Sequence, residues 1–370
     1  TGDGVTDDTA AIQAAINATP SGGALYIPAG VYKVLGSGTA ALTRNLPITI
    51  YGDGAGSLIM PATGFPNTRD VFKFTPTVPT AGYELSNFVI QGESSAHLGR
   101  HAIHIDTTAS GVTAYDWSIH NLTLLPTEAG NSIRVTNTQS SGGVFTSEIF
   151  DNNIESIWLT DVGDTIVIRN NVINSTSGTN PGIYFSQIIG AGNMQIVGNN
   201  IAVKFGHIIV DSGVAPIIRD NELETPVGVT NTYGVIIDLN GNVANIWAPQ
   251  VLNNQIQALA GTGNPIPIRV DKATNAQIAG GRLSVITGAH IIVDANATDT
   301  FIDVGLQYVT NNVIGTSTVT NNGTRTGWNL QRNSPAGTSG GIPYYVSTAS
   351  LASSGLLNTN PVDFGGGFLK

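Results

Sequence analysis

Hydrophobic and polar residues alternate along most of the chain, in short segments separated by turn residues. Apolar residues occupy every second position, which is the period of a β-strand with one buried face. One set of these segments reads AIHID, SIRVT, SIWLT, GIYFS, HIIVD, GVIID, PIRVD and HIIVD. The pattern predicts that the following residues point inward: Ile103, Ile105, Ile133, Val135, Ile157, Leu159, Ile183 and Phe185. The residues between them should point outward.

A second pattern, a polar residue followed by asparagine and alternating apolar residues, recurs between these segments. Its asparagines are Asn87, Asn121, Asn153, Asn171, Asn200, Asn221 and Asn254. Their uneven spacing is typical of a solenoid whose coils carry loops of different length. We predict that each asparagine occupies a left-handed bend and that its amide stacks on the asparagine of the next coil. The predicted fold is therefore all-β, a single-stranded parallel β-helix.

Helical periodicity is found near the start of the chain. Ile12 and Ile16 lie four residues apart on one face of a predicted helix over Ala10–Ala18. Thr6 is the expected N-cap, and Pro20 ends the helix.

The opening GDGVTDDTAAIQAAINA and the following GGALYIPAGVYKV, together residues 2–34, resemble the start of the pectate-lyase-like right-handed parallel β-helix superfamily. Bacteriophage tailspikes and capsule depolymerases have such an opening. The resemblance implies a helix that closes one end of the solenoid, a homotrimer, and a bacterial surface polysaccharide as partner. It also implies a place in the virion tail or a secreted, extracellular protein. It names no reaction, since the superfamily includes hydrolases, lyases and non-catalytic proteins.

Three regions are expected from these patterns. Residues 1–35 form the capping helix and first strands, residues 36–330 the parallel β-helix, and residues 331–370 a Gly/Ser-rich linker or arm. The last region resembles linkers of phage tail fibres. Because the sequence begins at Thr1, without Met or a signal-like segment, we expect it to be part of a longer protein.

Composition narrows the function classes. The net charge of −10 argues against a nucleic-acid partner, and no apolar run is long enough to span a membrane. The absence of cysteine excludes disulfides and thiolate metal sites. Charged residues are 11% of the chain, so its polar surface consists mainly of neutral hydrogen-bonding groups, which suits a glycan. We expect no cofactor and no metal.

Stacked coils should turn the outward positions into ladders. One predicted ladder is His104, Arg134, Trp158, Tyr184, Ile209, Ile236, Arg269 and Ile292, and the next is Asp106, Thr136, Thr160, Ser186, Asp211, Asp238, Asp271 and Asp294. Sugar rings pack an apolar face on aromatic rings, so Trp158 and Tyr184 are predicted to bind glycan, together with His104, Arg134 and His101. The alternative is that a loop covers the two rings as a small outer core. The apolar row of Ile209, Ile236 and Ile292 is predicted to be a subunit interface.

Glycoside hydrolysis uses two carboxyl groups. An acidic cluster lies beside the aromatic part of the ladder, and from it we predict that Glu155 acts with Asp161 or Asp164, with Asp106 contributing from a neighbouring coil. A second-ranked pair is Glu222 with Glu224. The aspartates that recur at strand ends, Asp211 and Asp238 among them, are interpreted as structural.

Two other functions stay open. A lyase of the same fold would abstract a proton beside a uronate carboxylate, with His101, His104 and Arg134 as the basic and cationic set. A glycan-binding adhesin or structural spike would leave the glycan uncut.

Overall fold

The structure is a computed structural model of the whole chain. It describes residues 1–78, 80–93, 99–107, 114–125, 130–136, 144–145, 147–163, 165–175, 180–187, 192–225, 234–258, 265–303, 305–310, 313–314, 319–323, 327–328 and 344–345.

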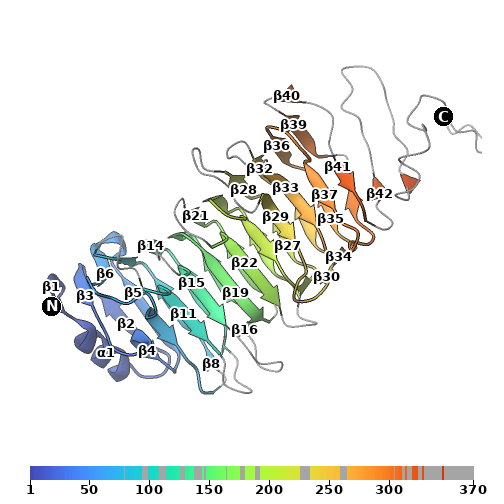
Figure 1. Cartoon of the computed structure of the whole chain (residues 1–370). Coiled ribbons are helices and arrows are strands. Elements are labelled where there is room, and N and C mark those ends of the chain that lie inside the picture. Colours follow the sequence, from blue (N-terminus) through green and yellow to red (C-terminus); the bar gives the residue numbers. More distant parts are fainter. Residues whose placement is uncertain are drawn as a thin grey trace, which may run out of the picture.

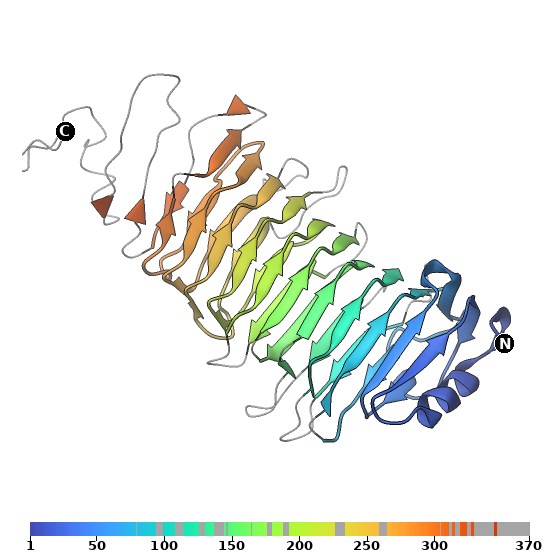
Figure 2. The same ribbon diagram turned by 180° about the vertical axis from the view of Figure 1, so that it is seen from behind.

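The chain winds into an elongated rod of stacked coils, with the N-terminus at one end and later residues progressively farther along it (Figure 1). Three long sheets run along the rod, and the views from opposite sides agree on this arrangement (Figure 2). Strands in these sheets pair in parallel, apart from β39 with β40 and β42 with β43. This is the predicted right-handed parallel β-helix, so the fold class is confirmed.

Sheet 1 consists of β1 (Asp3–Asp7), β3 (Gly30–Val34), β6 (Ser57–Pro61), β10 (Val89–Gln91), β14 (Thr123–Leu125), β18 (Asn153–Ile154), β21 (Val172–Ser175), β24 (Asn200–Val203), β28 (Glu222–Glu224), β32 (Gln255–Ala258), β36 (Arg282–Val285), β39 (Gln307–Thr310) and β40 (Val313–Ile314). Sheet 2 consists of β4 (Ala40–Arg44), β7 (Asp70–Phe74), β11 (Ile103–Asp106), β15 (Ile133–Thr136), β19 (Ile157–Val162), β22 (Ile183–Gln187), β25 (Ile208–Val210), β29 (Val235–Leu239), β33 (Ile266–Val270), β37 (Ile291–Val293) and β41 (Val319–Asn321).

Sheet 3 consists of β2 (Gly23–Ile27), β5 (Ile48–Gly52), β9 (Tyr83–Ser86), β13 (Ser118–His120), β17 (Ser147–Phe150), β20 (Ile166–Arg169), β23 (Gln195–Val197), β27 (Ile217–Arg219), β31 (Gln250–Leu252), β35 (Gln277–Ala279), β38 (Phe301–Ile302), β42 (Gly327–Trp328) and β43 (Tyr344–Tyr345). Two three-stranded sheets join β8 (Thr80–Ala81), β12 (Ala114–Tyr115) and β16 (Val144–Phe145), and β26 (Gly213–Val214), β30 (Ile246–Trp247) and β34 (Ala273–Thr274).

The core fills the inside of the rod with the inward residues of these sheets. All eight residues predicted to point inward in sheet 2, from Ile103 to Phe185, are fully buried. Burying each such side chain contributes roughly 1.5–3 kcal/mol. The period of two therefore identified the buried face of sheet 2 correctly.

The asparagine pattern separates into two columns. Residues at the bend take a left-handed backbone, among them Asn87, Asn121 and Asn253. The stacked amides belong to the residue that follows each bend, and the bonded series is Asn152, Asn171, Asn199, Asn221 and Asn254. The prediction was thus wrong in placing one asparagine in both roles, and it selected Asn153 and Asn200 where their preceding neighbours form the ladder.

The helix α1 (Thr9–Ala18) lies at the N-terminal end of the rod and buries Ile12 and Ile16, as predicted. It begins at Thr9, one residue before the predicted start, and its N-cap residue is Asp8 instead of the predicted Thr6. The Asp7 carboxylate accepts a hydrogen bond from the Thr9 backbone N–H at 3.0 Å. Within the described residues, no helix is long and apolar enough to cross a membrane. The predicted C-terminal arm, 331–370, lies outside the described residues except for β43.

Candidate functional site

The outward side chains of sheet 2 form a continuous column along the rod. In register they are Lys73, His104, Arg134, Trp158, Tyr184, Ile209, Asp238, Arg269 and Ile292. We call this set the outer column. It matches the prediction except at β29, where Asp238 pairs with Ile209 and Ile236 is fully buried. The predicted apolar row is therefore wrong at Ile236, which points into the core while Asp238 takes its place on the outer wall.

The N-terminal part of the outer column is a connected polar network. The Arg100 guanidinium donates two hydrogen bonds to the Asp70 carboxylate, at 2.9 and 2.8 Å. His104 Nδ1 lies 2.8 Å from the same carboxylate, and its Nε2 lies 3.2 Å from Thr136 Oγ1. Burial opposes ionisation of Asp70, but the hydrogen bonds from His104 and Arg100 outweigh it and lower the pKa of that carboxyl. Asp70 thus orients His104 as a carboxylate partner does in acid–base sites.

Asp70, His101 and His104 bring their ligand atoms within 4.8 Å of one another, which is close enough for a metal site. These groups are already engaged: Arg100 binds Asp70, and the Asn131 backbone N–H donates to His101 Nδ1 at 2.9 Å. Burial lowers the pKa of His101 to about 3, so this ring is neutral. A cation here would lie beside the Arg100 guanidinium, which makes the cluster a poor metal site.

An aromatic stack occupies the middle of the outer column. The Trp158 and Tyr184 rings stack with centroids 4.0 Å apart, and the Arg134 guanidinium lies 5.1 Å from the Trp158 ring centroid. Coil stacking places Arg134 and Tyr184 on opposite sides of the indole, so its two faces are covered. No face of the indole is therefore free for a sugar ring, and glycan binding by Trp158 and Tyr184 stays a prediction. Burial, with the hydrogen bond to Asp211, raises the pKa of Tyr184.

Two aspartates follow the aromatic stack and differ from all the other acidic groups of the outer wall. Asp211, directly after β25, accepts a hydrogen bond from the Tyr184 hydroxyl, and Asp238 lies on β29. The Oδ1 atom of each is buried and has no hydrogen-bond donor among the described residues. Burial, reinforced by the nearby charges of Asp271 and Asp211, raises the pKa of Asp238 to about 6, although Arg269 opposes the shift.

Such unsatisfied buried carboxylates are costly and mark functional sites. Strand spacing and rise place the Cα atoms of Asp211 and Asp238 roughly 8 Å apart. One carboxyl that keeps its proton up to about pH 6, beside one that is held by a tyrosine, is an arrangement suited to acid–base catalysis.

The carboxylates selected from the sequence lie elsewhere. Glu155 precedes β19 and Asp161 lies near its far end, so roughly 20 Å of extended chain separates them. Asp161 adjoins the aromatic stack, and burial raises its pKa. Asp106 forms an ion pair with Lys73 at 2.9 Å. Asp164 lies outside the described residues. The structure thus does not bring Glu155 and Asp161 together.

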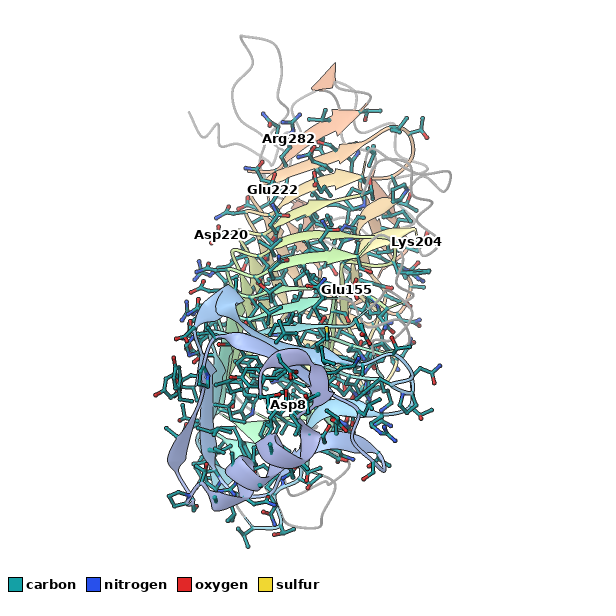
Figure 3. All side chains as sticks on the ribbon, turned by 90° about the vertical axis from the view of Figure 1, so that its left-hand side faces the viewer. Asp8, Glu155, Lys204, Asp220, Glu222 and Arg282 are labelled. Carbon is teal, nitrogen blue, oxygen red and sulfur yellow. The ribbon has the colours of Figure 1, made fainter. Side chains whose placement is uncertain are left out.

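The second-ranked pair, Glu222 and Glu224, lies exposed on β28 of sheet 1. Glu222 projects with Asp220 from one side of the rod, opposite to Lys204 (Figure 3). Both glutamates therefore lie on a different wall from the outer column.

Sequence reasoning missed Asp211 and Asp238 because segments were aligned by their terminal aspartates. In β29 that alignment is displaced by two residues, since Ile237 pairs with Ile208. The sequence did contain a signal for the correct register. Leu239 continues the apolar alternation beyond Asp238, so Asp238 lies within the strand and not at its end.

A protein-family model described as rhamnogalacturonase A/epimerase, pectate lyase-like, matches residues 1–224, more than half of the chain. The chain belongs to this family. The resemblance read from the N-terminal motif is confirmed at the level of the pectate-lyase-like superfamily.

Individual relatives of this pectate-lyase-like protein are distant. A stretch of 64 residues is 47% identical to mannuronan C5-epimerase AlgE5 of Azotobacter vinelandii, covering 16% of this chain and 6% of the epimerase. The surface adhesin PfbA of Streptococcus pneumoniae has a TM-score of 0.52 at 14% identity, covering 94% of this chain and 95% of PfbA. ORF18 of Geobacillus virus E2 has a TM-score of 0.47 at 17% identity, covering 89% of this chain and 59% of that protein. The likeness to PfbA concerns the fold alone.

Proposed function

We propose that this pectate-lyase-like protein is a glycoside hydrolase that cleaves a polysaccharide lying along the outer column. Asp238 donates a proton to the leaving glycosidic oxygen, and Asp211 acts as the base that activates water. The observation that carries the proposal is the pair of buried, unsatisfied carboxylate oxygens on these two residues.

The roles follow from the two environments. A general acid needs a raised pKa so that it keeps its proton near the working pH, and the pKa of Asp238 is about 6. Asp211 accepts a hydrogen bond from the Tyr184 hydroxyl, which holds its carboxylate in place on the outer wall. Two carboxyl groups on neighbouring coils of one wall can flank a single glycosidic bond, as glycoside hydrolysis requires.

Cleavage products test this reaction directly. The protein is incubated with bacterial capsular, O-antigen and exopolysaccharide preparations, and the fragments are weighed by mass spectrometry. Hydrolysis adds one water for each bond broken, so every fragment has the mass of its sugar residues plus one water. Asp238→Asn and Asp211→Asn should abolish cleavage, while Glu155→Gln, at the position selected from the sequence, should retain it. Equal cleavage by Asp238→Asn and the unmodified protein would remove the pair from the mechanism.

A lyase or epimerase reaction is the second candidate, and the Asp70–His104 contact favours it. An oriented histidine can take the proton beside a uronate carboxylate. The chain also shares a stretch with an enzyme named for mannuronan C5-epimerisation. Elimination would leave an unsaturated sugar that absorbs ultraviolet light and would add no water, so the same fragments separate it from hydrolysis. Epimerisation would give no fragments and would change only the C5 configuration of the sugars, which proton NMR of the polymer detects.

The biological setting proposed here is the one that the N-terminal motif implies: a homotrimeric, virion-tail or secreted depolymerase acting on a bacterial surface polysaccharide. Sedimentation of the protein tests the trimer. Glycan binding without any change in glycan length or in the configuration of its sugars would instead assign the protein to the non-catalytic adhesins.

A further inference from the structure

Among the described residues, the cations on the outer wall of sheet 2 are paired with carboxylates, except for Arg134. Lys73 binds Asp106 at 2.9 Å, Arg100 binds Asp70 at 2.8 Å, and Arg269 binds Asp294 at 2.6 Å. Arg134 has no carboxylate partner within ion-pair distance among the described residues. Its contacts are the Thr136 hydroxyl and the Trp158 ring.

Arg134 is half-buried, so its charge has lost part of its hydration without forming a direct ion pair with any described residue. Burial of a charge is costly unless an opposite charge or hydrogen bonds compensate for it. One of its five donor hydrogens is engaged, by Nε to Thr136 Oγ1 at 3.0 Å. The remaining donors on the terminal nitrogens form a planar fork that fits a carboxylate with two parallel hydrogen bonds.

Neighbouring contacts hold this fork in place. Contact with the Trp158 ring restricts the guanidinium on one side. Thr136 accepts from Arg134 and is itself within hydrogen-bond distance of His104, which Asp70 orients. A fixed guanidinium loses less entropy when it binds an anion, so the site is organised before the ligand arrives.

The distance between Arg134 and Asp238 along the rod indicates what Arg134 can contact. Arg134 lies on β15, four strands before β29, and a strand spacing of ~4.8 Å places it about 19 Å from Asp238. It is too far away to touch the reacting bond, but a polysaccharide chain lying along the outer column would pass both groups.

We infer that Arg134 binds the carboxylate of an acidic sugar several units from the cleaved bond, and so selects acidic polysaccharides. The inference rests on the proposed function, because that function places the polysaccharide along the outer column. A contact so far from the reaction contributes to substrate binding in the ground state and in the transition state alike. Its loss should therefore raise KM and leave kcat nearly unchanged.

The test uses an array of acidic bacterial polysaccharides beside the same polymers after carbodiimide and borohydride reduction, which converts each carboxylate to a hydroxymethyl group. The inactive Asp238→Asn protein serves as the binder, so cleavage does not erode the signal. We expect binding to an acidic polymer that reduction weakens by roughly 10-fold to 100-fold, the range for a charge-assisted hydrogen bond. Added to Asp238→Asn, Arg134→Gln should weaken binding of the acidic polymer by the same factor and leave the reduced polymer unaffected.

Two variants sharpen the result. Arg134→Lys keeps the charge and should retain part of the preference for the acidic polymer. Arg219→Gln removes an exposed cation from sheet 3 and should change nothing. Equal binding of acidic and reduced polymers, or equal weakening of both by Arg134→Gln, would overturn the inference. If the protein binds an acidic polymer selectively but the unmodified protein does not cleave it, the proposed hydrolysis alone is contradicted. If the protein binds no polymer, both the hydrolysis and the role of Arg134 are contradicted.

Discussion

Asp238→Asn should make the protein more stable at neutral pH while abolishing cleavage. Burial raises the pKa of Asp238 from 3.8 to about 6. A carboxyl whose pKa is higher in the folded state stabilises the fold below its unfolded pKa, and that contribution is lost as pH rises through the folded value. At pH 7 the ionised, unsatisfied carboxylate therefore costs about 3 kcal/mol, from ~1.4 kcal/mol per pKa unit.

Asparagine has nearly the same shape and stays neutral, so the variant avoids this cost. For a chain of 370 residues, about 3 kcal/mol corresponds to a rise in Tm of about 4 °C. The rise should appear at pH 7 and vanish near pH 3.5, below both pKa values. Scanning calorimetry across this pH range measures it.

The matched control is Asp220→Asn, which changes an exposed aspartate on a different wall. Its Tm difference from the unmodified protein should show no comparable dependence on pH. A loss of stability in Asp238→Asn at pH 7, or a gain that persists at pH 3.5, would refute the reasoning that Asp238 carries an uncompensated charge.

Further predictions concern catalysis and the asparagine ladder. The kcat/KM of cleavage should fall as pH rises above about 6, because Asp238 loses the proton that it must donate; a flat profile up to pH 8 would contradict this role. Tyr184→Phe removes the hydrogen bond to Asp211 and should lower kcat about 10-fold without unfolding the protein, as circular dichroism can verify. Asn199→Ala leaves buried amides of the ladder unsatisfied and should cost ~1–3 kcal/mol in denaturant unfolding, whereas Asn200→Ala, at its exposed neighbour, should cost less than ~0.5 kcal/mol.

The sequence was sufficient for the fold because the rules that govern a β-helix are local. A period of two identifies the buried face, and a recurring bend marks each coil, so Ile103 and its equivalents could be placed without knowing their neighbours. The register between coils is not local. A displacement of two residues keeps the same face buried but changes which outward residues become neighbours, and this is why Ile236 was placed where Asp238 lies.

The candidate site depended on that register and on side-chain contacts. Trp158 and Tyr184 were found from the sequence, but their stacking with each other and with Arg134 follows from the coil spacing. Asp211 belongs to a regular series of strand-end aspartates. Only the contact with Tyr184 and the buried, unsatisfied oxygen distinguish it from Asp271 and Asp294, which bind Arg269.

Proton NMR of polysaccharide cleavage tests the central claim most directly, because it reports the bond broken and the configuration of the new chain end together. The Asp211–Asp238 pair predicts new reducing ends that first appear in a single anomeric configuration, and a signal that is absent with Asp238→Asn. An olefinic proton in the products, or the same signal from Asp238→Asn, would contradict it.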